Sequence, residues 1–273
     1  MKLEEFGDAK HPIGASGLPR LMCCDWCALM RVLKLTEDRG GVAANNGTAT
    51  GRAIQLWHDS EGRRDLRDLL DQLKIEAFDG PKGGGHPFPD YEEAPVSLFT
   101  ERYITDPRNS PRLVSVIDQE KRVTLQLPPH PLDQTRQPVH IVGHIDQVRV
   151  TIQTGHKSLW DLKTGRAGGG TMLDEFVFQQ GAYVLGLDGV TPGGIIRLRD
   201  YTSKAALKLP PNHNVVFYPY QLGLDDFELL MEAVTLRVAL LRMGEVTPNP
   251  GPWCNWCPAG GISECVRILR SQQ

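Results

Sequence analysis

The stretch Gly143-His144-Ile145-Asp146, followed fifteen positions after its acid by Asp161-Leu162-Lys163, decides the fold of this chain. The first motif ends a β-branched run that begins at Val139, and a second run alternates from Val148 to Ile152. A third run covers residues 158–163 after a short polar turn. We therefore predict three consecutive strands, whose pairing places Asp146 and Asp161 side by side at one end.

The residue types in these motifs suit metal-dependent chemistry. Asp161 and Lys163 are two positions apart, so in a strand they point to the same face. Two carboxylates and a lysine in one cleft suit a hard divalent cation, Mg²⁺ or Mn²⁺, that keeps several waters. We expect Asp146, Asp161 and the Leu162 carbonyl to bind the metal, and Lys163 to orient or activate the attacking water. The alternative for an isolated Asp-x-Lys is a solvated hairpin with ordinary surface charges.

A helical pattern between about Asp174 and Leu187 supplies the third motif. Gln179 and Tyr183 lie four positions apart in it and share one helix face. In this order and near this spacing, the three motifs resemble the RecB-like branch of the PD-(D/E)XK nucleases, with its G-x-x-D strand, D-x-K-T-G strand and Q-x-x-x-Y helix. The resemblance implies an α/β fold with a restriction-endonuclease-like core, in which helices flank a mixed central β-sheet. It also implies that Gln179 and Tyr183 position the nucleic-acid strand or the lysine.

The resemblance implies two further metal-site positions nearer the N-terminus. Family members carry a Gly-x-x-x-His helix whose histidine helps to bind metal, but Gln55 follows Gly51 at that spacing here. His58, three positions further on nearly the same face, is the alternative ligand. Members also have a supporting glutamate on an early strand. Residues 97–104 alternate as a strand would and offer Glu101, whose alternative is a solvent-facing position.

The cysteines provide an independent indication. They occur only near the two ends of the chain, and their C-x-x-C spacing suits metal or cluster ligation better than disulfides. Some RecB-like nucleases hold a [4Fe–4S] cluster with one cysteine before the core and three after it. The resemblance therefore implies a cluster with zinc as the alternative metal, bound by Cys24, Cys254, Cys257 and Cys265. Cys23 and Cys27 are the alternatives for the N-terminal ligand, and the Cys257–Cys265 spacing is longer than is usual in the family.

Length and charge agree with one folded unit. The chain has 273 residues, a net charge of −3 and a pI near 6.2, which is not the basic surface of a nucleic-acid coat protein. Because cysteines from both ends would have to meet, we predict a single nuclease domain over 1–273, with residues 16–35 and 253–265 forming an iron–sulfur subdomain. No secretory or transmembrane segment is recognisable, which predicts a cytoplasmic protein without a membrane partner.

The remaining pattern predicts the elements around this core. We expect helices over residues 18–35, 52–74 and 226–243, the last with a capping box formed by Asp225 and Glu228. We expect further strands near residues 96–104, 112–117, 122–127, 194–201 and 215–220.

Together these features predict a metal-dependent DNA nuclease, an exonuclease acting on DNA ends or single strands. Recombination, repair and CRISPR adaptation use this architecture, so proteins of such complexes are the expected partners. The alternative is a catalytically idle nucleic-acid-binding or scaffolding module, which the missing family histidine favours. The intact Asp146, Asp161 and Lys163 argue against it, because an idle relative has little physical reason to keep clustered carboxylates. A phosphate-cradling ATPase is excluded because no G-x-x-x-x-G-K-[ST] loop is present.

Overall fold

The computed structural model describes residues 3–24, 42–75, 77–78, 86–87, 90–165, 172–199, 214–245 and 249. Most of the predicted iron–sulfur subdomain, including Cys27, Cys254, Cys257 and Cys265, lies outside the described residues. None of the described helices has the length and hydropathy needed to cross a membrane.

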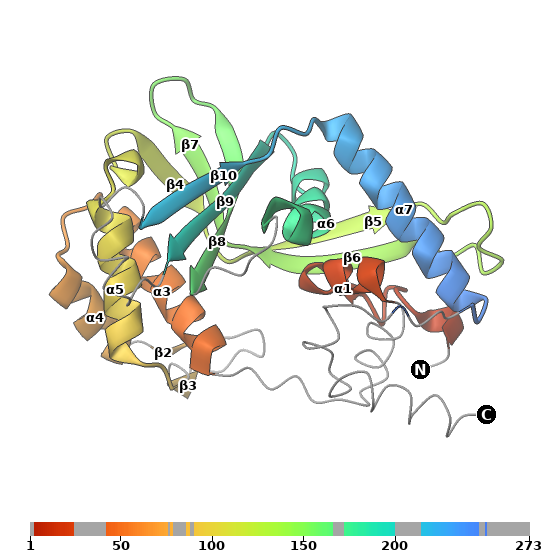
Figure 1. Cartoon of the computed structure of the whole chain (residues 1–273), viewed down its shortest axis with the longest axis horizontal. Coiled ribbons are helices and arrows are strands. Elements are labelled where there is room, and N and C mark those ends of the chain that lie inside the picture. Colours follow the sequence, from red (N-terminus) through yellow and green to blue (C-terminus); the bar gives the residue numbers. More distant parts are fainter. Residues whose placement is uncertain are drawn as a thin grey trace.

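Two mixed sheets form the described core, where the sequence predicted one central sheet (Figure 1). The larger sheet has the strand order β10-β9-β8-β7-β4, with β8 and β9 parallel and the other neighbours antiparallel. Its strands are β4 (Val114–Asp118), β7 (Gln147–Thr151), β8 (Lys157–Gly165), β9 (Thr191–Arg199) and β10 (Val215–Pro219). The predicted strands at these places are confirmed, with ends shifted by a few residues.

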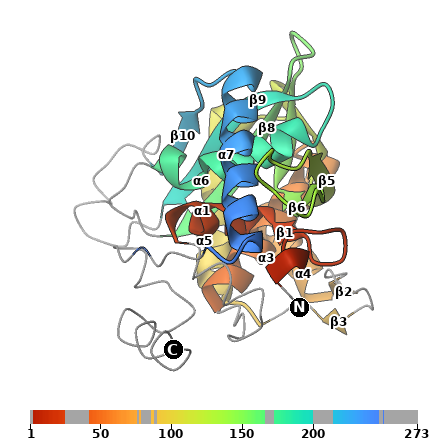
Figure 2. The ribbon, with the colours of Figure 1, turned by 90° about the vertical axis from the view of Figure 1, so that its right-hand side faces the viewer.

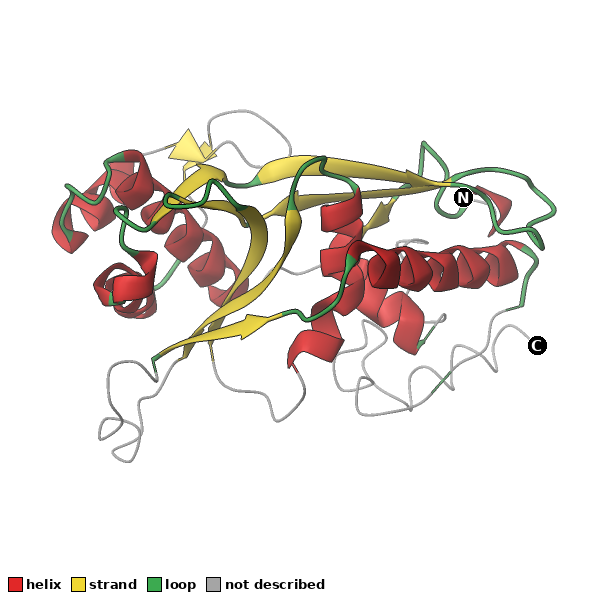
Figure 3. Ribbon diagram, turned by 90° about the horizontal axis from the view of Figure 1, so that it is seen from above, coloured by secondary structure: helices red, strands yellow, loops and turns green. Residues whose placement is uncertain are grey.

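The smaller sheet has the order β1-β6-β5, and two of its strands continue directly into strands of the larger sheet. Its strands are β1 (Ile13–Gly14), β5 (Lys121–Leu127) and β6 (Val139–Ile145). Only Gln119 and Glu120 separate β4 from β5, and only Asp146 separates β6 from β7. The continuous segments β4–β5 and β6–β7 therefore each pass from one sheet into the other. They run antiparallel to each other, and their bends lie side by side (Figure 3). The prediction of one sheet was wrong because these two bends are too short to be visible as breaks in the alternation.

Helices on the left of Figure 1 pack on the larger sheet. They are α3 (Val42–Asp59), α4 (Leu66–Ile75) and α5 (Glu93–Thr105), and their apolar faces meet Ile196, Leu198 and Val215 of β9 and β10. A small ribbon of β2 (Ala77–Phe78) and β3 (His86–Pro87) follows α4.

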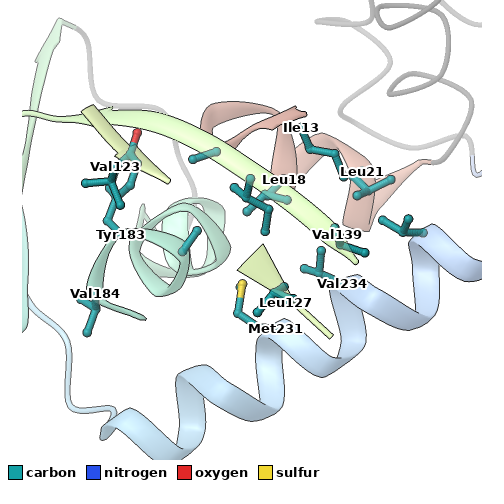
Figure 4. Close-up of a cluster of buried hydrophobic side chains, with 14 of the residues drawn as sticks. Ile13, Leu18, Leu21, Val123, Leu127, Val139, Tyr183, Val184, Met231 and Val234 are labelled. Carbon is teal, nitrogen blue, oxygen red and sulfur yellow. The ribbon is translucent and has the colours of Figure 1, made fainter. Parts of the chain in front are cut away.

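A second group of helices covers the smaller sheet. It comprises α1 (Leu18–Cys23), α6 (Met172–Leu185) and α7 (Leu224–Arg242). Their buried side chains form one core with β5 and β6, in which Leu18 of α1, Tyr183 of α6 and Met231 of α7 take part (Figure 4). Figure 2 shows α7 running along the outside of this layer. Short 3₁₀ turns complete the described chain at η1 (Leu3–Glu5), η2 (Ala15–Gly17) and η3 (Pro107–Asn109).

Several predicted helix boundaries were wrong. The first helix ends at Cys23 rather than near residue 35, because Cys24 is extended (φ −160°, ψ 112°). The second begins at Val42 rather than near residue 52, and it stops at Asp59 rather than near residue 74. Positive φ at Glu61 and Gly62 then turns the chain before α4. Helix α7 begins after Gly223, whose N–H donates to Asp226, so the predicted Asp225–Glu228 capping box is replaced by this contact.

The segment predicted as a strand over residues 96–104 is helix α5. Its buried residues are Val96, Phe99, Thr100 and Tyr103, which recur at helical rather than alternating spacing. The strand prediction followed the local alternation around Glu101 and missed the longer period.

A buried arginine at the end of α7 ties three distant segments together. The Arg242 side chain is fully buried, and its guanidinium pairs with Asp133 at 2.6 Å. It also donates to the carbonyls of Phe6, Gln137 and Pro138 at 2.9, 2.7 and 3.2 Å. The planar five-donor guanidinium suits such a set of acceptors, which a lysine cannot reproduce.

We predict that Arg242→Ala lowers the free energy of unfolding by about 3–5 kcal/mol, because it leaves Asp133 buried without its cation. Glu228→Ala, an exposed change on the same helix, should alter it by less than about 0.5 kcal/mol. Urea denaturation of the three proteins measures both values. Equal stability of the Arg242 and Glu228 variants would contradict this role.

Candidate active site

The bends between the two sheets place acidic residues beside β8. Asp146 occupies the single position between β6 and β7, and Glu120 lies between β4 and β5. Because β5 pairs with β6 and β4 pairs with β7, the two bends are neighbours. Lys121 lies opposite Ile145 on one side of the bends, and Asp118 lies opposite Val148 on the other. Both acids therefore occupy the junction of the sheets.

Asp146 is joined directly to the backbone of β8. Its Oδ2 accepts a 2.6 Å hydrogen bond from the N–H of Leu162. This N–H is available because the pairing of β7 with β8 stops at Gln147 and Trp160. In a strand the N–H and C=O of one residue point to the same side. The Leu162 carbonyl therefore also points toward the Asp146 side of β8.

Asp161 and Lys163 share one face of β8, as their spacing predicts. Lys163 Nζ lies 2.7 Å from Asp161 Oδ2, and the Asp161 side chain is only 3% exposed. Oδ1 of Asp161 is buried without a hydrogen-bond partner among the described residues. A buried carboxylate oxygen without a donor is costly, so this atom favours a cation as its missing partner. The Lys163 ammonium also lies 4.4 Å from the centre of the Phe176 ring, which holds it over α6.

Crowding of the carboxylates disfavours the ionisation of Asp146 and Glu120. Burial raises the pKa of Asp146 well above its usual range, and the neighbouring charges of Asp161 and Glu120 raise it further. Lys163 and the Leu162 N–H oppose this shift. Desolvation by neighbouring protein and the charge of Asp161 also raise the pKa of Glu120, although the residue as a whole is exposed to solvent. A divalent cation would relieve all of these repulsions at once.

Glu120 was missed by the sequence reasoning, which had assigned the supporting glutamate to Glu101. Glu101 is an exposed residue of helix α5, so the prediction that it lies on a core strand was wrong. Glu120 has a left-handed backbone (φ 51°), which costs a non-glycine residue on the order of 1–2 kcal/mol. The sequence shows only that Glu120 lies in the short link between two alternating runs, and the strand pairing that brings this link beside Asp146 is not visible in it.

Gln179 and Tyr183 approach the site from α6, on the shared helix face that the sequence predicts. Gln179 Nε2 donates to the Tyr183 hydroxyl at 3.0 Å, and both side chains are largely buried. Burial raises the Tyr183 pKa, and the three carboxylates add to the shift, so the hydroxyl stays protonated. A Cβ at Gly143 would lie 2.6 Å from Tyr183 Cε1. Glycine in the G-x-x-D motif therefore permits the tyrosine to press against β6.

His58 lies in an aromatic cluster, and the described contacts do not join it to Asp146 or Asp161. Its Nε2 lies 3.0 Å from the Tyr103 hydroxyl, which in turn donates to Gln147 Oε1 at 3.2 Å. Burial, aided by the charge of Arg149, lowers the pKa of His58 to about 3. The ring is therefore a neutral partner of Tyr103, and this arrangement does not favour the predicted ligand role.

Gly51 lies on the face of α3 that is directed toward Glu120. A Cβ at Gly51 would lie 3.9 Å from Glu120 Oε1, and Gln119 Nε2 donates to the Gly51 carbonyl at 2.7 Å. Gln55 lies one turn further along this face, where the half-buried amide accepts from Arg52 at 2.7 Å. Among the described contacts, Gln55 is joined to Arg52 and not to the three acids.

The residues present fit a divalent cation with a partly aqueous shell. Within the described part of the chain, no three His, Cys, Asp or Glu side chains already converge in metal-ligand geometry. Asp146 and Asp161 would supply two oxygens and the Leu162 carbonyl a third, with water completing the shell, as Mg²⁺ prefers. The unpartnered Asp161 Oδ1 is the structural observation that supports this fit.

Of the predicted cluster ligands, Cys24 falls within the described residues. It is 3% exposed, and its Sγ accepts a 3.5 Å hydrogen bond from the N–H of Asn249. The Asn249 side chain donates to the Cys23 carbonyl at 3.0 Å. Asn249 precedes Cys254 by five positions. Asn249 therefore lies beside the two N-terminal cysteines Cys23 and Cys24.

Comparison with known proteins agrees with the described core. A family model for the PD-(D/E)XK nuclease superfamily matches residues 15–262. The crystal structure of a presumed exonuclease from Eubacterium rectale is similar, with 13% identity, 93% of this chain and 89% of that chain covered, and a TM-score of 0.51. The crystal structure of SSO0001 has 14% identity over 77% and 81% of the two chains, with a TM-score of 0.36. No curated protein matches the chain.

The crowded carboxylates predict an unusual effect of charge removal. The pKa of Asp146 is higher in the folded chain than in the unfolded chain. The folded state therefore loses stability as the pH rises from the unfolded-state pKa through the folded-state pKa. At pH 8 without metal, Asp146→Asn and Glu120→Gln should therefore raise the melting temperature. Glu61→Gln, which changes another left-handed glutamate far from these acids in sequence, should leave it unchanged.

Thermal denaturation with and without Mn²⁺ tests this arrangement further. The ion should stabilise the wild type but not Asp146→Asn, because binding to the folded state alone raises stability. A metal-free Asp146→Asn protein that is less stable than wild type at pH 8 would contradict the proposed repulsion.

His58 should make folding sensitive to acid. Its pKa is lower in the folded chain than the unfolded value near 6.5, so stability is lost as pH falls from about 6.5 toward 3. Between pH 7 and 5 the wild type should lose about 2 kcal/mol of its free energy of unfolding through this residue. His58→Gln should lose less of its free energy of unfolding over the same interval. Urea denaturation at the two pH values measures the difference. The same loss in both proteins would show that His58 does not titrate as proposed.

Proposed function

Since the chain belongs to the PD-(D/E)XK nuclease superfamily, we propose that it is a divalent-metal-dependent deoxyribonuclease of the RecB-like type. The observation that carries this proposal is the buried Asp161, which has one unpartnered oxygen and the Lys163 ammonium 2.7 Å from the other. A purely structural ion pair would have no need of the adjacent Asp146. The combination of two acids and one amine suits hydrolysis of a phosphodiester bond.

The roles of the residues follow from their positions. When bound, Mg²⁺ or Mn²⁺ supplies Lewis acidity toward a phosphoryl oxygen. Asp146 and Asp161 would hold it, aided by the Leu162 carbonyl. Lys163 donates a hydrogen bond to the attacking water and offsets the charge that develops on the phosphate. Water adds to phosphorus and releases one proton to solvent, the bond to one sugar oxygen breaks, and that oxygen takes up one proton from solvent. Gln179 fixes the Tyr183 hydroxyl, which positions the strand beside Lys163.

Our narrower proposal is an exonuclease that acts on DNA ends or single strands. The RecB-like motifs support it, and the similar Eubacterium rectale protein is itself described as a presumed exonuclease. We place this activity in recombination, repair or CRISPR adaptation in the cytoplasm, with proteins of such a complex as partners.

We also propose that a [4Fe–4S] cluster joins the two ends of the chain. Cys24 would be the N-terminal ligand, and Cys254, Cys257 and Cys265 would complete the set. The contact between Cys24 and Asn249 supports this proposal, because it brings the N-terminal thiol to the segment that leads to the other three. Closing so long a loop with metal would add to folding stability. Zinc is the chemical alternative for the same thiolates.

A second candidate function is a catalytically idle DNA-binding or scaffolding module. Gln55 stands where the family has histidine, and His58 is engaged with Tyr103, so a nitrogen ligand is lacking among the described groups at the acids. This observation favours loss of activity. The retained repulsion among Asp146, Asp161 and Glu120 favours metal-dependent catalysis instead.

We predict that Asp161→Ala and Lys163→Ala each lower the rate of DNA hydrolysis at least ~10²-fold. Asp161→Ala removes a metal ligand, whereas Lys163→Ala spares the acids but removes the cation beside the reacting phosphate. Lys157→Ala changes an exposed lysine on the same strand and should retain full activity. Digestion of end-labelled single- and double-stranded DNA with Mg²⁺, Mn²⁺ or chelator measures these rates. Equal cleavage in chelator would refute the assignment, and an inactive but DNA-binding wild type would favour the idle module.

For the cluster, we predict a brown protein that contains iron and sulfide after anaerobic purification. Cys24→Ala should lose the colour, whereas Cys23→Ala, its half-exposed neighbour, should keep it. Elemental analysis and visible absorption give the result independently of nuclease activity. A colourless wild type with about one zinc per chain would replace the cluster by a zinc site.

A further inference from the structure

A cavity of about 620 Å³ lies at the edge of β6, and Gln179 and Tyr183 of the candidate site contribute to its wall. Its wall includes Gly14 and Ser16 on one side, Arg122 and His144 on another, and Gln179 and Tyr183 of α6 on a third. The volume falls within the about 300–1,000 Å³ of sites that enclose small molecules. A nucleotide-sized group can therefore enter this cavity, whereas a double helix cannot.

The cavity exists because a strand pairing stops early. Strand β1 pairs with β6 only at Ile141 and Val142, after which the chain turns into η2. Among the described strands, Gly143 and His144 are therefore paired on the β5 side alone. The resulting opening lies immediately before Asp146.

Arg122 and His144 form a polar pair at the rim. They lie directly opposite each other in the β5–β6 ladder, and both side chains are exposed. Within the described residues, Arg122 has no ion pair with an acid, so its guanidinium is available to a ligand. An exposed arginine beside a polar imidazole suits a phosphate oxygen, because guanidinium groups bind phosphate through paired hydrogen bonds.

We propose that this cavity is a subsite for a single DNA strand, in which Arg122 and His144 contact the phosphate next to the one that is hydrolysed. The proposal rests on the nuclease function proposed above. His144 and Asp146 are two positions apart, which is about 7 Å in extended chain. This separation matches one nucleotide step in an extended strand.

Two substitutions test the subsite without touching the proposed metal ligands. Arg122→Gln removes the cation and keeps a polar side chain. Gly14→Leu partly fills the cavity rim, where a Cβ meets no atom within 4 Å and the backbone (φ −67°) accepts any residue. Arg67→Gln is the matched control, because Arg67 is an exposed arginine on α4. All three are made in an Asp161→Asn chain, so that cleavage does not interfere with binding.

Fluorescence anisotropy with a short oligodeoxythymidylate and with a blunt duplex gives the readout, after thermal denaturation has shown that each variant is folded. Arg122→Gln should weaken single-strand binding about tenfold and lower the salt dependence by about 0.7 in log–log slope. Gly14→Leu should weaken single-strand binding similarly, whereas Arg67→Gln should not.

Unchanged single-strand binding in both Arg122→Gln and Gly14→Leu would overturn the subsite, as would an equal loss in Arg67→Gln. The parent chain must also bind the single strand more tightly than the duplex, and the reverse order would refute the choice of ligand. If wild type cleaves no DNA but this binding pattern is found, the nuclease proposal fails and the subsite stands. If wild type cleaves DNA and the pattern is not found, only the subsite fails.

Discussion

The rest of the site depends on the passage of two neighbouring strands from one sheet into the other at the same level. The bends at Glu120 and Asp146 bring two carboxylates together, and β8 adds Asp161 at the point where β7 no longer pairs with it. The released N–H of Leu162 then binds Asp146, which fixes the distance between the acids. Regular pairing through this junction would satisfy the backbone but would leave no open coordination positions.

This arrangement is unfavourable for the metal-free fold and useful for catalysis. Burial and mutual repulsion raise the pKa values of Asp146 and Glu120, and Glu120 adds backbone strain. Lys163 offsets only part of the charge. The surrounding structure tolerates this cost through rigid contacts elsewhere, such as the buried Arg242 network and the close fit of Tyr183 on Gly143. A bound cation would relieve the repulsion between the carboxylates, which adds to its affinity, and the acids need not move to bind it.

The motifs on β6, β8 and α6 could be predicted from sequence, because each combines a clear period with residues that act locally. The Asp161–Lys163 and Gln179–Tyr183 contacts follow directly from spacings of two and four. Glu120 could not be found this way, since its role depends on the pairing of β4 with β7, which no local pattern encodes. The role of His58 depends likewise on Tyr103, a residue of a helix that alternation had made look like a strand.

Diffraction from crystals grown with Mn²⁺ tests the central claim most directly, because anomalous scattering locates the ion independently of activity. We predict one strong anomalous peak within coordination distance of the Asp146 and Asp161 carboxylates, with the Leu162 carbonyl turned toward it. The same crystals of Asp146→Asn should lack the peak. A fully occupied ion elsewhere in the chain, with the Asp146 and Asp161 carboxylates unligated at saturating Mn²⁺, would contradict the account.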